Sequence, residues 1–271
     1  MIVTSDPVLA AGLAGALAAL LGLAVPAVLV RLPEPAPGAE PDPGDPAAGV
    51  DPAVGAGSGR AGSTTPAPAQ LGPPVPPKVP YAELAARPGL AGWCAVAAGF
   101  AAAAMGASRG LRPDLPVWIY LAVLGVALSY VDWRTRLLPI RLVAPSYGVV
   151  AALLLIAAAA DWADGSEALL RAAISWLAVF AVFFLLWFTY PAGLGYGDVR
   201  LSGVLGMALG WLGVPAVVVG MYGGLLLGAV IGGVLALAKV VDRKGYPFGP
   251  FMLVGAFLGV LHAGGDLVFW R

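Results

Sequence analysis

The sequence predicts an all-α membrane protein, a polytopic helical bundle with about eight transmembrane helices. The chain has 271 residues, of which 60% are hydrophobic and only 11% are charged, and its mean hydropathy is +0.88. A surface this apolar needs lipid as its solvent, so the bilayer is the first expected partner. A bilayer core about 30 Å thick takes roughly 20 apolar residues per helical span, and a helix satisfies its own backbone hydrogen bonds there.

The first 89 residues contain one apolar run and one Pro-rich segment. The run from 8 to 30 has no Lys or Arg before it. It is longer than the apolar region of a signal peptide, about 7 to 15 residues, so residues 1–30 are predicted to form a retained span. From residue 31 to about 80 the chain is rich in Pro, Gly, Ala and Ser. Because this composition does not offset the entropy lost on ordering, residues 31–89 are predicted to be a flexible cytoplasmic linker.

Seven further apolar runs follow, and residues 90–271 are predicted to form a membrane-embedded bundle. The runs cover residues 90–108, 115–131, 142–160, 169–190, 199–212, 214–241 and 248–269. The run 199–212 is short for a span. We expect Gly203, Gly206 and Gly210 to let it pack closely against its neighbours.

Lys and Arg residues predict the orientation, because loops rich in them are cytoplasmic. The residues that mark this side are Arg31, Arg134, Arg136, Arg141, Lys239, Arg243 and Lys244. Asp161, Asp164 and Glu167 are expected in a loop on the opposite side, where both termini would also lie. Arg109 and Arg112 fall on that opposite side and are the one conflict with this orientation.

Charge and cysteine content narrow the choice of partners and cofactors. Fifteen basic and fifteen acidic residues give no net charge, so no nucleic-acid partner is indicated. The chain has one cysteine, Cys94, within an apolar run, which excludes an intrachain disulfide and a zinc site built on a cysteine pair. We expect Cys94 to be a small buried residue, and we predict no metal and no cofactor.

Two aspartates are the candidate catalytic residues. Asp132 directly follows the apolar run 115–131, and an interfacial acid paired with Arg136 one helical turn away is the alternative interpretation. Asp198 lies between two apolar runs, after Gly195 and Gly197, which permit a tight turn and close backbone approach. A helix N-cap aspartate is the alternative there.

The two acids together indicate more than each does alone. Both fall on the predicted cytoplasmic side, each at the end of a span. Two carboxyl groups that share one proton are the minimal apparatus of an aspartic protease, because one can deprotonate water while the other polarises the scissile carbonyl. This chemistry needs no metal, no serine nucleophile and no histidine base.

Three stretches resemble the prepilin peptidase, or type IV leader peptidase, family of membrane aspartyl proteases. They are Asp132 to Pro139 with the spacing Asp-x5-Leu-Pro, Gly195-Tyr-Gly-Asp198-Val-Arg-Leu201, and Pro247 to Ala256. The stretches occur in the family's order, and the resemblance covers roughly residues 115–269. It departs from the family at Ile140, where relatives commonly have Asp or Asn, and at Arg200, where they usually have Lys.

The resemblance implies an eight-span inner-membrane endopeptidase with Asp132 and Asp198 as its catalytic pair. Such enzymes cut the short basic leader from type IV pilins or secretion pseudopilins, just after a glycine, at the cytoplasmic face. Gly195, Gly197 and Arg200 would shape the site around Asp198. Residues 248–251 would be a structural motif at the start of the last span, or a simple Pro/Gly turn.

Relatives often carry a Cys-x-x-Cys region linked to zinc and to N-methylation of the cleaved pilin. The Pro-rich segment occupies its place here, so we do not expect methyltransferase activity. Two other classes of function stay open: an ion- or proton-coupled transporter with intramembrane acids, and an inactive membrane scaffold. A proton relay needs acids near the middle of the membrane, whereas these two lie at span ends.

Overall fold

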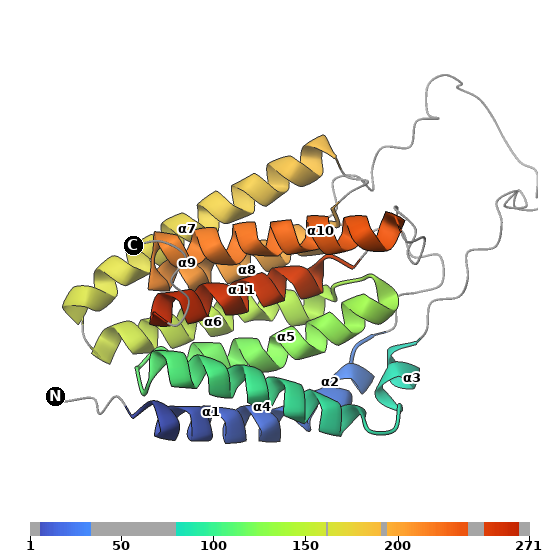
Figure 1. Cartoon of the computed structure of the whole chain (residues 1–271), viewed down its shortest axis with the longest axis horizontal. Coiled ribbons are helices and arrows are strands. Elements are labelled where there is room, and N and C mark those ends of the chain that lie inside the picture. The colour runs from blue at the N-terminus through green and yellow to red at the C-terminus, as the bar shows by residue number, and fades with distance from the viewer. Residues whose placement is uncertain (1–5, 34–79, 161, 191–193, 238–246, 266–271) are drawn as a thin grey trace, which may run out of the picture.

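The computed structural model of this chain describes residues 6–33, 80–160, 162–190, 194–237 and 247–265. Within these ranges the chain is helical and contains no strand. The helices lie side by side in an elongated bundle (Figure 1). The predicted all-α class is therefore confirmed.

The helices follow the predicted apolar runs. They are α1 (Pro7–Gly22), α2 (Val25–Val30), α3 (Tyr81–Ala85), α4 (Leu90–Arg109), α5 (Leu115–Thr135), α6 (Ile140–Ala160), α7 (Trp162–Thr189), α8 (Tyr196–Leu212), α9 (Val214–Val217), the π-helical turn η2 (Val218–Tyr222), α10 (Gly223–Leu237) and α11 (Gly249–Gly264). In the described part of the chain, six helical stretches are long and apolar enough to cross a membrane: Pro7–Val30, Leu90–Arg109, Leu115–Thr135, Ile140–Ala160, Trp162–Thr189 and Val214–Val234. With the shorter helices α8 and α11, they correspond to the eight predicted runs.

Helix α7 begins earlier than predicted. Asp164 and Glu167, expected in a loop, lie in the first two turns of this helix, while Asp161 lies outside the described residues. Acidic side chains near a helix N-terminus interact favourably with the helix dipole, and both of these remain exposed. Two turns of helix therefore replace the expected acidic loop.

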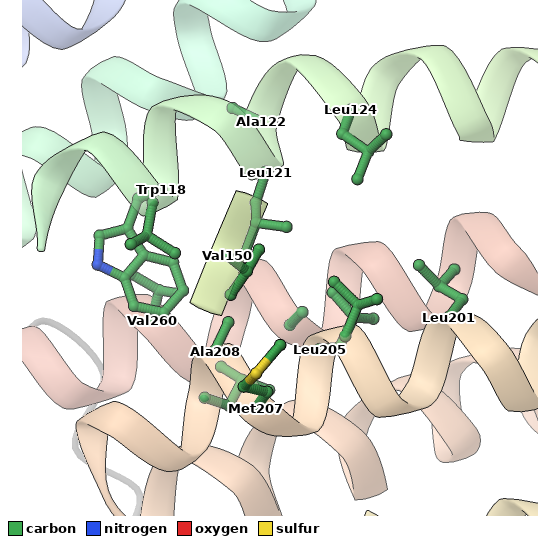
Figure 2. Packing of buried hydrophobic residues seen from close by; sticks show 14 of the residues in the cluster. Trp118, Leu121, Ala122, Leu124, Val150, Leu201, Leu205, Met207, Ala208 and Val260 are labelled. Atoms are coloured by element: carbon green, nitrogen blue, oxygen red, sulfur yellow. The ribbon is translucent and has the colours of Figure 1, made fainter. Parts of the chain in front are cut away.

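Helix α8 is enclosed on all sides, because every residue from Leu201 to Gly210 is buried. Its side chains Leu201 and Leu205 belong to one buried cluster with Trp118, Leu121 and Leu124 of α5, and Leu201 lies on the side of Leu124 (Figure 2).

The glycines of α8 lie against its neighbours. A Cβ on Gly206 would lie 2.8 Å from Cβ of Val179, and one on Gly210 would lie 2.5 Å from Cβ of Ser175, both on α7. A Cβ on Gly203 would collide with the Tyr147 hydroxyl of α6. The predicted close packing of this short helix is confirmed.

The first span packs closely against α4 through small residues on one face of α1. Ala10, Ala14, Ala18 and Gly22 follow one another at four-residue intervals on α1, and all four are buried. A Cβ on Gly22 would lie 2.8 Å from Cα of Ala95 on α4. Small side chains at this spacing let two membrane helices approach closely.

The predicted linker falls mostly on residues 34–79, which lie outside the described residues. Its described end contains α3, whose Tyr81 and Leu84 pack with Leu29 at the end of the first span. The Tyr130 hydroxyl of α5 donates a hydrogen bond to the Leu84 carbonyl at 3.0 Å. Apolar residues three positions apart thus form one docked helical turn where only linker was expected. Cys94 of α4 is buried, as predicted.

Candidate active site

Asp132 lies in the last turn of α5, where the helix ends in a left-handed cap. The Arg136 amide donates to the Asp132 carbonyl at 2.7 Å, and Arg136 has a φ of 55°. The Asp132 side chain is only 4% exposed, and its Oδ2 accepts a hydrogen bond from the Gly249 amide at 3.0 Å. Both Asp132 and Arg136 are described, and no ion pair joins them. The alternative interpretation of a simple Asp132–Arg136 surface pair is therefore wrong.

Asp198 is the third residue of α8 and is 7% exposed. The N-cap position belongs to Gly195, so the alternative of an N-cap aspartate is wrong in position. Asp198 still helps to start the helix, because its Oδ2 accepts a hydrogen bond from the Gly195 amide at 3.2 Å. A carboxylate that reaches back to the N-cap amide satisfies one of the free N–H groups of a helix start.

Leu138 connects the surroundings of the two acids. It lies in the loop between α5 and α6, within the Leu-Pro of the first motif. A Cβ on Gly197 would lie 2.9 Å from Cβ of Leu138, and a Cβ on Gly249 would lie 3.4 Å from its Cδ2. The charge of Asp132 also acts electrostatically on Asp198. The structure therefore brings both predicted acids together at one end of the bundle.

Gly249 lies in the third of the quoted stretches, Pro247 to Ala256, but its contact with Asp132 was not predicted. It is the first residue of α11, and a Cβ at this position would lie 2.9 Å from Oδ2 of Asp132. Glycine is therefore required for the close approach of the two helices. A signal was available, since the first N–H groups of a helix lack partners within the helix and often bind carboxylates.

Arg200 is held beside the start of α8 by its aromatic neighbours. Its guanidinium carbon lies 4.6 Å from the centre of the Tyr196 ring, and its carbonyl accepts a hydrogen bond from the Tyr147 hydroxyl. The Tyr196 ring in turn packs on Trp187 at 5.0 Å between ring centres. A stacked guanidinium is a geometry that Lys reproduces poorly, because an ammonium is a point charge.

An apolar pocket of about 360 Å³ leads away from the acids along α4, α5 and α11. Its wall on α5 ends at Ser129, three residues before Asp132, and its wall on α11 begins at Leu253, four residues after Gly249. At a rise of about 1.5 Å per residue, these walls end within about one helical turn of the acids. Exposed Phe100 and Val254 lie at its edge, so the pocket opens to the side of the bundle.

The described part of the chain contains no group of three or more His, Cys, Asp or Glu side chains that could hold a metal ion.

Residues 119–241 match the type IV leader peptidase family. This segment includes Asp132, Leu138 and Asp198, whereas Gly249 lies beyond the matched residues.

Curated relatives of this peptidase family agree with the match. Three proteins named prepilin leader peptidase/N-methyltransferase are similar to the chain. The one from Aeromonas salmonicida (strain A449) is 29% identical over 142 residues, which cover 50% of this chain and 45% of the relative. The one from Pseudomonas putida is 31% identical over 142 residues, 50% of this chain and 46% of the relative. The one from Pectobacterium carotovorum subsp. carotovorum is 29% identical over 161 residues, 57% of this chain and 55% of the relative.

The similarity is partial in both directions. The chain spans about half the length of these curated relatives. No solved structure matches the chain.

Proposed function

We propose that this chain is an aspartic endopeptidase that removes the leader from type IV prepilin-like or pseudopilin substrates. Asp132 and Asp198 are its catalytic pair in this proposal. The observation that carries it is the convergence of two buried carboxyl groups around Leu138, within a segment of the leader peptidase family. The names of the relatives supply the substrate class.

The hydrogen bonds leave each acid suited to its role. Oδ2 of Asp132 accepts from Gly249 and Oδ2 of Asp198 accepts from Gly195, so each carboxyl group is oriented by one backbone amide. The second oxygen of each remains for a water molecule or a substrate carbonyl. Like-charge repulsion and burial favour a single shared proton, which is the starting state of an aspartic protease.

The reaction then needs only the pair, water and the peptide. The ionised carboxylate removes a proton from water, and the resulting hydroxide oxygen bonds to the scissile carbonyl carbon. The protonated partner donates a hydrogen bond, and then its proton, to the carbonyl oxygen. As the C–N bond of the resulting diol breaks, the protonated carboxyl group gives its proton to the peptide nitrogen, and the ionised one takes a proton from a hydroxyl of the diol, which becomes the carboxyl group of the product. One water is consumed, and the pair again holds one shared proton.

The apolar pocket is a candidate binding site for part of the substrate. We propose that the apolar helix following the leader lies in this pocket, against α4, α5 and α11. Because two of these helices carry Asp132 and the Gly249 amide one turn further on, such a helix would present its leader junction to the acids. The basic leader would then extend beyond the end of the bundle.

The charge distribution supports a cytoplasmic position for this end. Among the described residues, the basic residues at the end with the acids are Arg31, Arg87, Arg134, Arg136, Arg141 and Arg200. Those at the other end are Arg109, Arg112 and Arg171. Arg109 is neutralised by an ion pair with Asp114, and three more acids lie at that end: Asp6, Asp164 and Glu167. An excess of basic residues marks the cytoplasmic side, so the candidate site faces the cytoplasm of a bacterial inner membrane in this proposal.

The transporter alternative fits these positions less well. Asp132 is three residues from the end of α5, and Asp198 is the third residue of α8. A relay across the membrane needs an ionisable group near the midplane. The N-methyltransferase activity in the relatives' names is outside this proposal, because the chain has a single cysteine.

Co-expression of the full chain with candidate prepilins tests the proposal. We expect the wild-type chain to shorten the prepilin by its leader, and Asp132→Asn and Asp198→Asn to abolish the shortening at equal expression. Asp164→Asn, which removes an exposed carboxylate at the opposite end, is the matched control. Cleavage above a few per cent of wild type in either active-site variant would exclude the pair.

A further inference from the structure

A second, polar cavity lies at the end of the bundle opposite the two acids. It has a volume of about 780 Å³, is open to the outside, and is lined by the ends of α4, α5, α6, α7, α8 and α11 and the start of α1. Helix α5 runs from this cavity at Asp114 to the candidate active site at Asp132. The size is typical of ligand-binding cavities, which hold about 300 to 1,000 Å³.

Three arginines line this cavity, at the end where the orientation predicts few. They are Arg109, Arg112 and Arg171. Two aspartates, Asp114 and Asp164, also line it, so the lining keeps one net positive charge. A basic cluster on the predicted non-cytoplasmic side departs from the usual bias and calls for a local reason.

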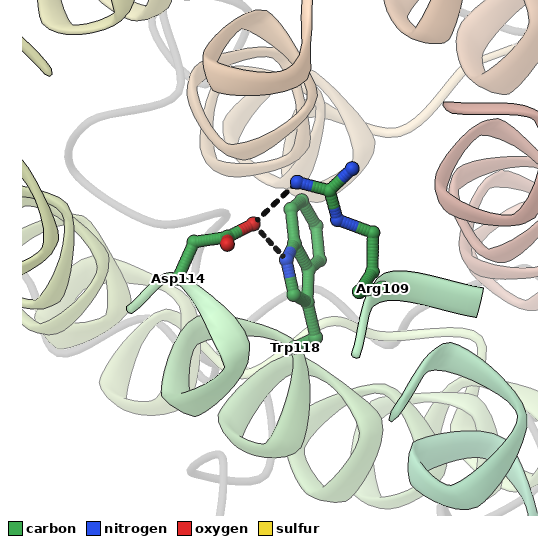
Figure 3. A network of polar contacts seen from close by, with 3 residues as sticks. All are labelled: Arg109, Asp114 and Trp118. Atoms are coloured by element: carbon green, nitrogen blue, oxygen red, sulfur yellow. Dashed lines mark hydrogen bonds and ion pairs between the residues drawn. The ribbon is translucent and has the colours of Figure 1, made fainter. Parts of the chain in front are cut away.

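Arg109 lines the cavity with a mostly buried side chain, and not all of its N–H groups have a hydrogen-bond partner among the described residues. Its Nη2 donates to Oδ2 of Asp114 at 3.0 Å, and the same oxygen accepts from the Trp118 indole nitrogen at 2.8 Å (Figure 3). The side chains of Arg109 and Asp114 are 9% and 3% exposed. The buried Nε of Arg109 has no hydrogen-bond partner among the described residues, and its second terminal nitrogen points away from Asp114 (Figure 3).

Arg112 and Arg171 have their charges available. Neither forms an ion pair with any described residue. Asp164 lies seven residues before Arg171 on α7 and Glu167 lies four residues before it, but neither forms an ion pair with Arg171. Guanidinium groups are the preferred protein partners of phosphate, because their planar fork donates two parallel hydrogen bonds.

We propose that this cavity binds a phosphate-bearing anion through Arg112 and Arg171, with Arg109 and Asp114 as its rigid wall. The phosphate would belong to an anionic lipid head group or to a soluble phosphate. Apolar Leu111, Trp211 and Leu212 also line the cavity, beside which a lipid chain could continue. Basic pockets between membrane helices hold anionic head groups on the cytoplasmic or matrix side, and this cavity would do the same on the opposite side. This inference is independent of the proposed peptidase activity.

Binding to the purified full chain in a neutral detergent tests the inference. The probes are dihexanoyl-phosphatidylglycerol below its micelle concentration, inorganic phosphate, and dihexanoylglycerol, which has the same acyl chains without phosphate. Isothermal titration calorimetry measures each Kd. We expect dihexanoyl-phosphatidylglycerol to bind and dihexanoylglycerol not to bind. If inorganic phosphate also binds, the cavity recognises the phosphate alone. If inorganic phosphate does not bind, the cavity recognises the anionic lipid.

Matched variants separate the cavity from general surface charge. Arg112→Gln/Arg171→Gln should weaken binding about a hundredfold, since each charged hydrogen bond contributes about tenfold or more. Arg112→Lys/Arg171→Lys keeps the charge but lacks the planar guanidinium group, so its Kd should lie between those of the wild type and the double Gln variant. Arg87→Gln/Arg134→Gln, two exposed arginines at the other end, should bind as the wild type does.

Three results would overturn the inference. They are no binding of either phosphate probe, equal binding of dihexanoylglycerol, and an equal loss in the Arg87→Gln/Arg134→Gln control. Because the cavity arginines Arg112 and Arg171 are exposed and unpaired with described residues, their substitution leaves the buried core unchanged.

Discussion

The backbone amide of Gly249 lies 3.0 Å from Oδ2 of Asp132, although 117 residues separate them in the chain. The amide is one of the free N–H groups at the start of α11, so it provides both a hydrogen bond and the positive end of a helix dipole. The last helix of the described bundle therefore fixes the orientation of an acid at the end of α5.

This contact predicts that Gly249→Ala impairs cleavage without unfolding the protein. The added Cβ would lie 2.9 Å from Asp132 Oδ2, so the carboxyl group must move. A displacement of about 1 Å can cost roughly 100-fold in rate, and we expect a loss of that order in kcat/KM for prepilin cleavage. Gly148→Ala, at a helical glycine with open space around it, should retain activity. Equal activity of the two variants would remove Gly249 from the site.

A second prediction concerns the cooperation of Asp132 and Asp198. If they share one proton and act on one water, removing either carboxylate removes the whole function. Asp132→Asn/Asp198→Asn should then be no less active than each single variant, and each should lose at least about 100-fold. If the loss of rate in the double variant equalled the product of the two single losses, the two acids would have independent roles.

The third prediction is that chelators leave cleavage unchanged. The proposed reaction draws its proton transfers from two carboxyl groups, so EDTA should not alter the rate for the purified chain. A loss of activity in EDTA that added zinc restores would contradict the two-carboxylate mechanism.

Much of the site could be predicted from local sequence. Asp132 follows an apolar run and Asp198 precedes one, so their positions at the ends of spans could be predicted without knowing the fold. The glycines of α8 likewise predicted its close packing, which α7 confirms through Val179 and Ser175.

The remaining features depend on which helices become neighbours. The Gly249–Asp132 contact requires α11 to lie against α5, and no periodicity within either helix encodes that pairing. The turn α3 was missed for a different reason, because Tyr81 and Leu84 stand beside a Pro-rich segment whose composition dominates the prediction. Leu138 and Gly249 lie within two of the quoted stretches, but their contacts across the site depend on how the segments pack and could not be predicted from those stretches alone.

The fourth prediction tests whether the apolar pocket is the binding site of the substrate's apolar helix. Ala97 lines the pocket and is exposed, so Ala97→Trp fills it without disturbing the core. We expect kcat/KM for a prepilin with its apolar helix to fall by about tenfold or more, because the lost contacts position the scissile bond. Ala181→Trp, at an exposed alanine of α7 outside the pocket, is the matched control. Equal rates for both variants would place the substrate elsewhere.

The fifth prediction concerns Asp114, whose carboxylate accepts from both Arg109 and Trp118. Asp114→Ala would leave the Arg109 guanidinium, itself 9% exposed, without its counter-charge. Removing one partner of a buried ion pair costs about 3 to 5 kcal/mol, so the thermal unfolding midpoint in detergent should fall clearly. Asp164→Ala, an exposed acid at the same end, should leave the midpoint near that of the wild type. Arg109→Met/Asp114→Leu removes both charges and should recover much of the loss, since an apolar pair replaces an ion pair without leaving a buried charge. An unchanged midpoint for Asp114→Ala would mean that water reaches Arg109, and that the cavity wall is more open than its burial indicates.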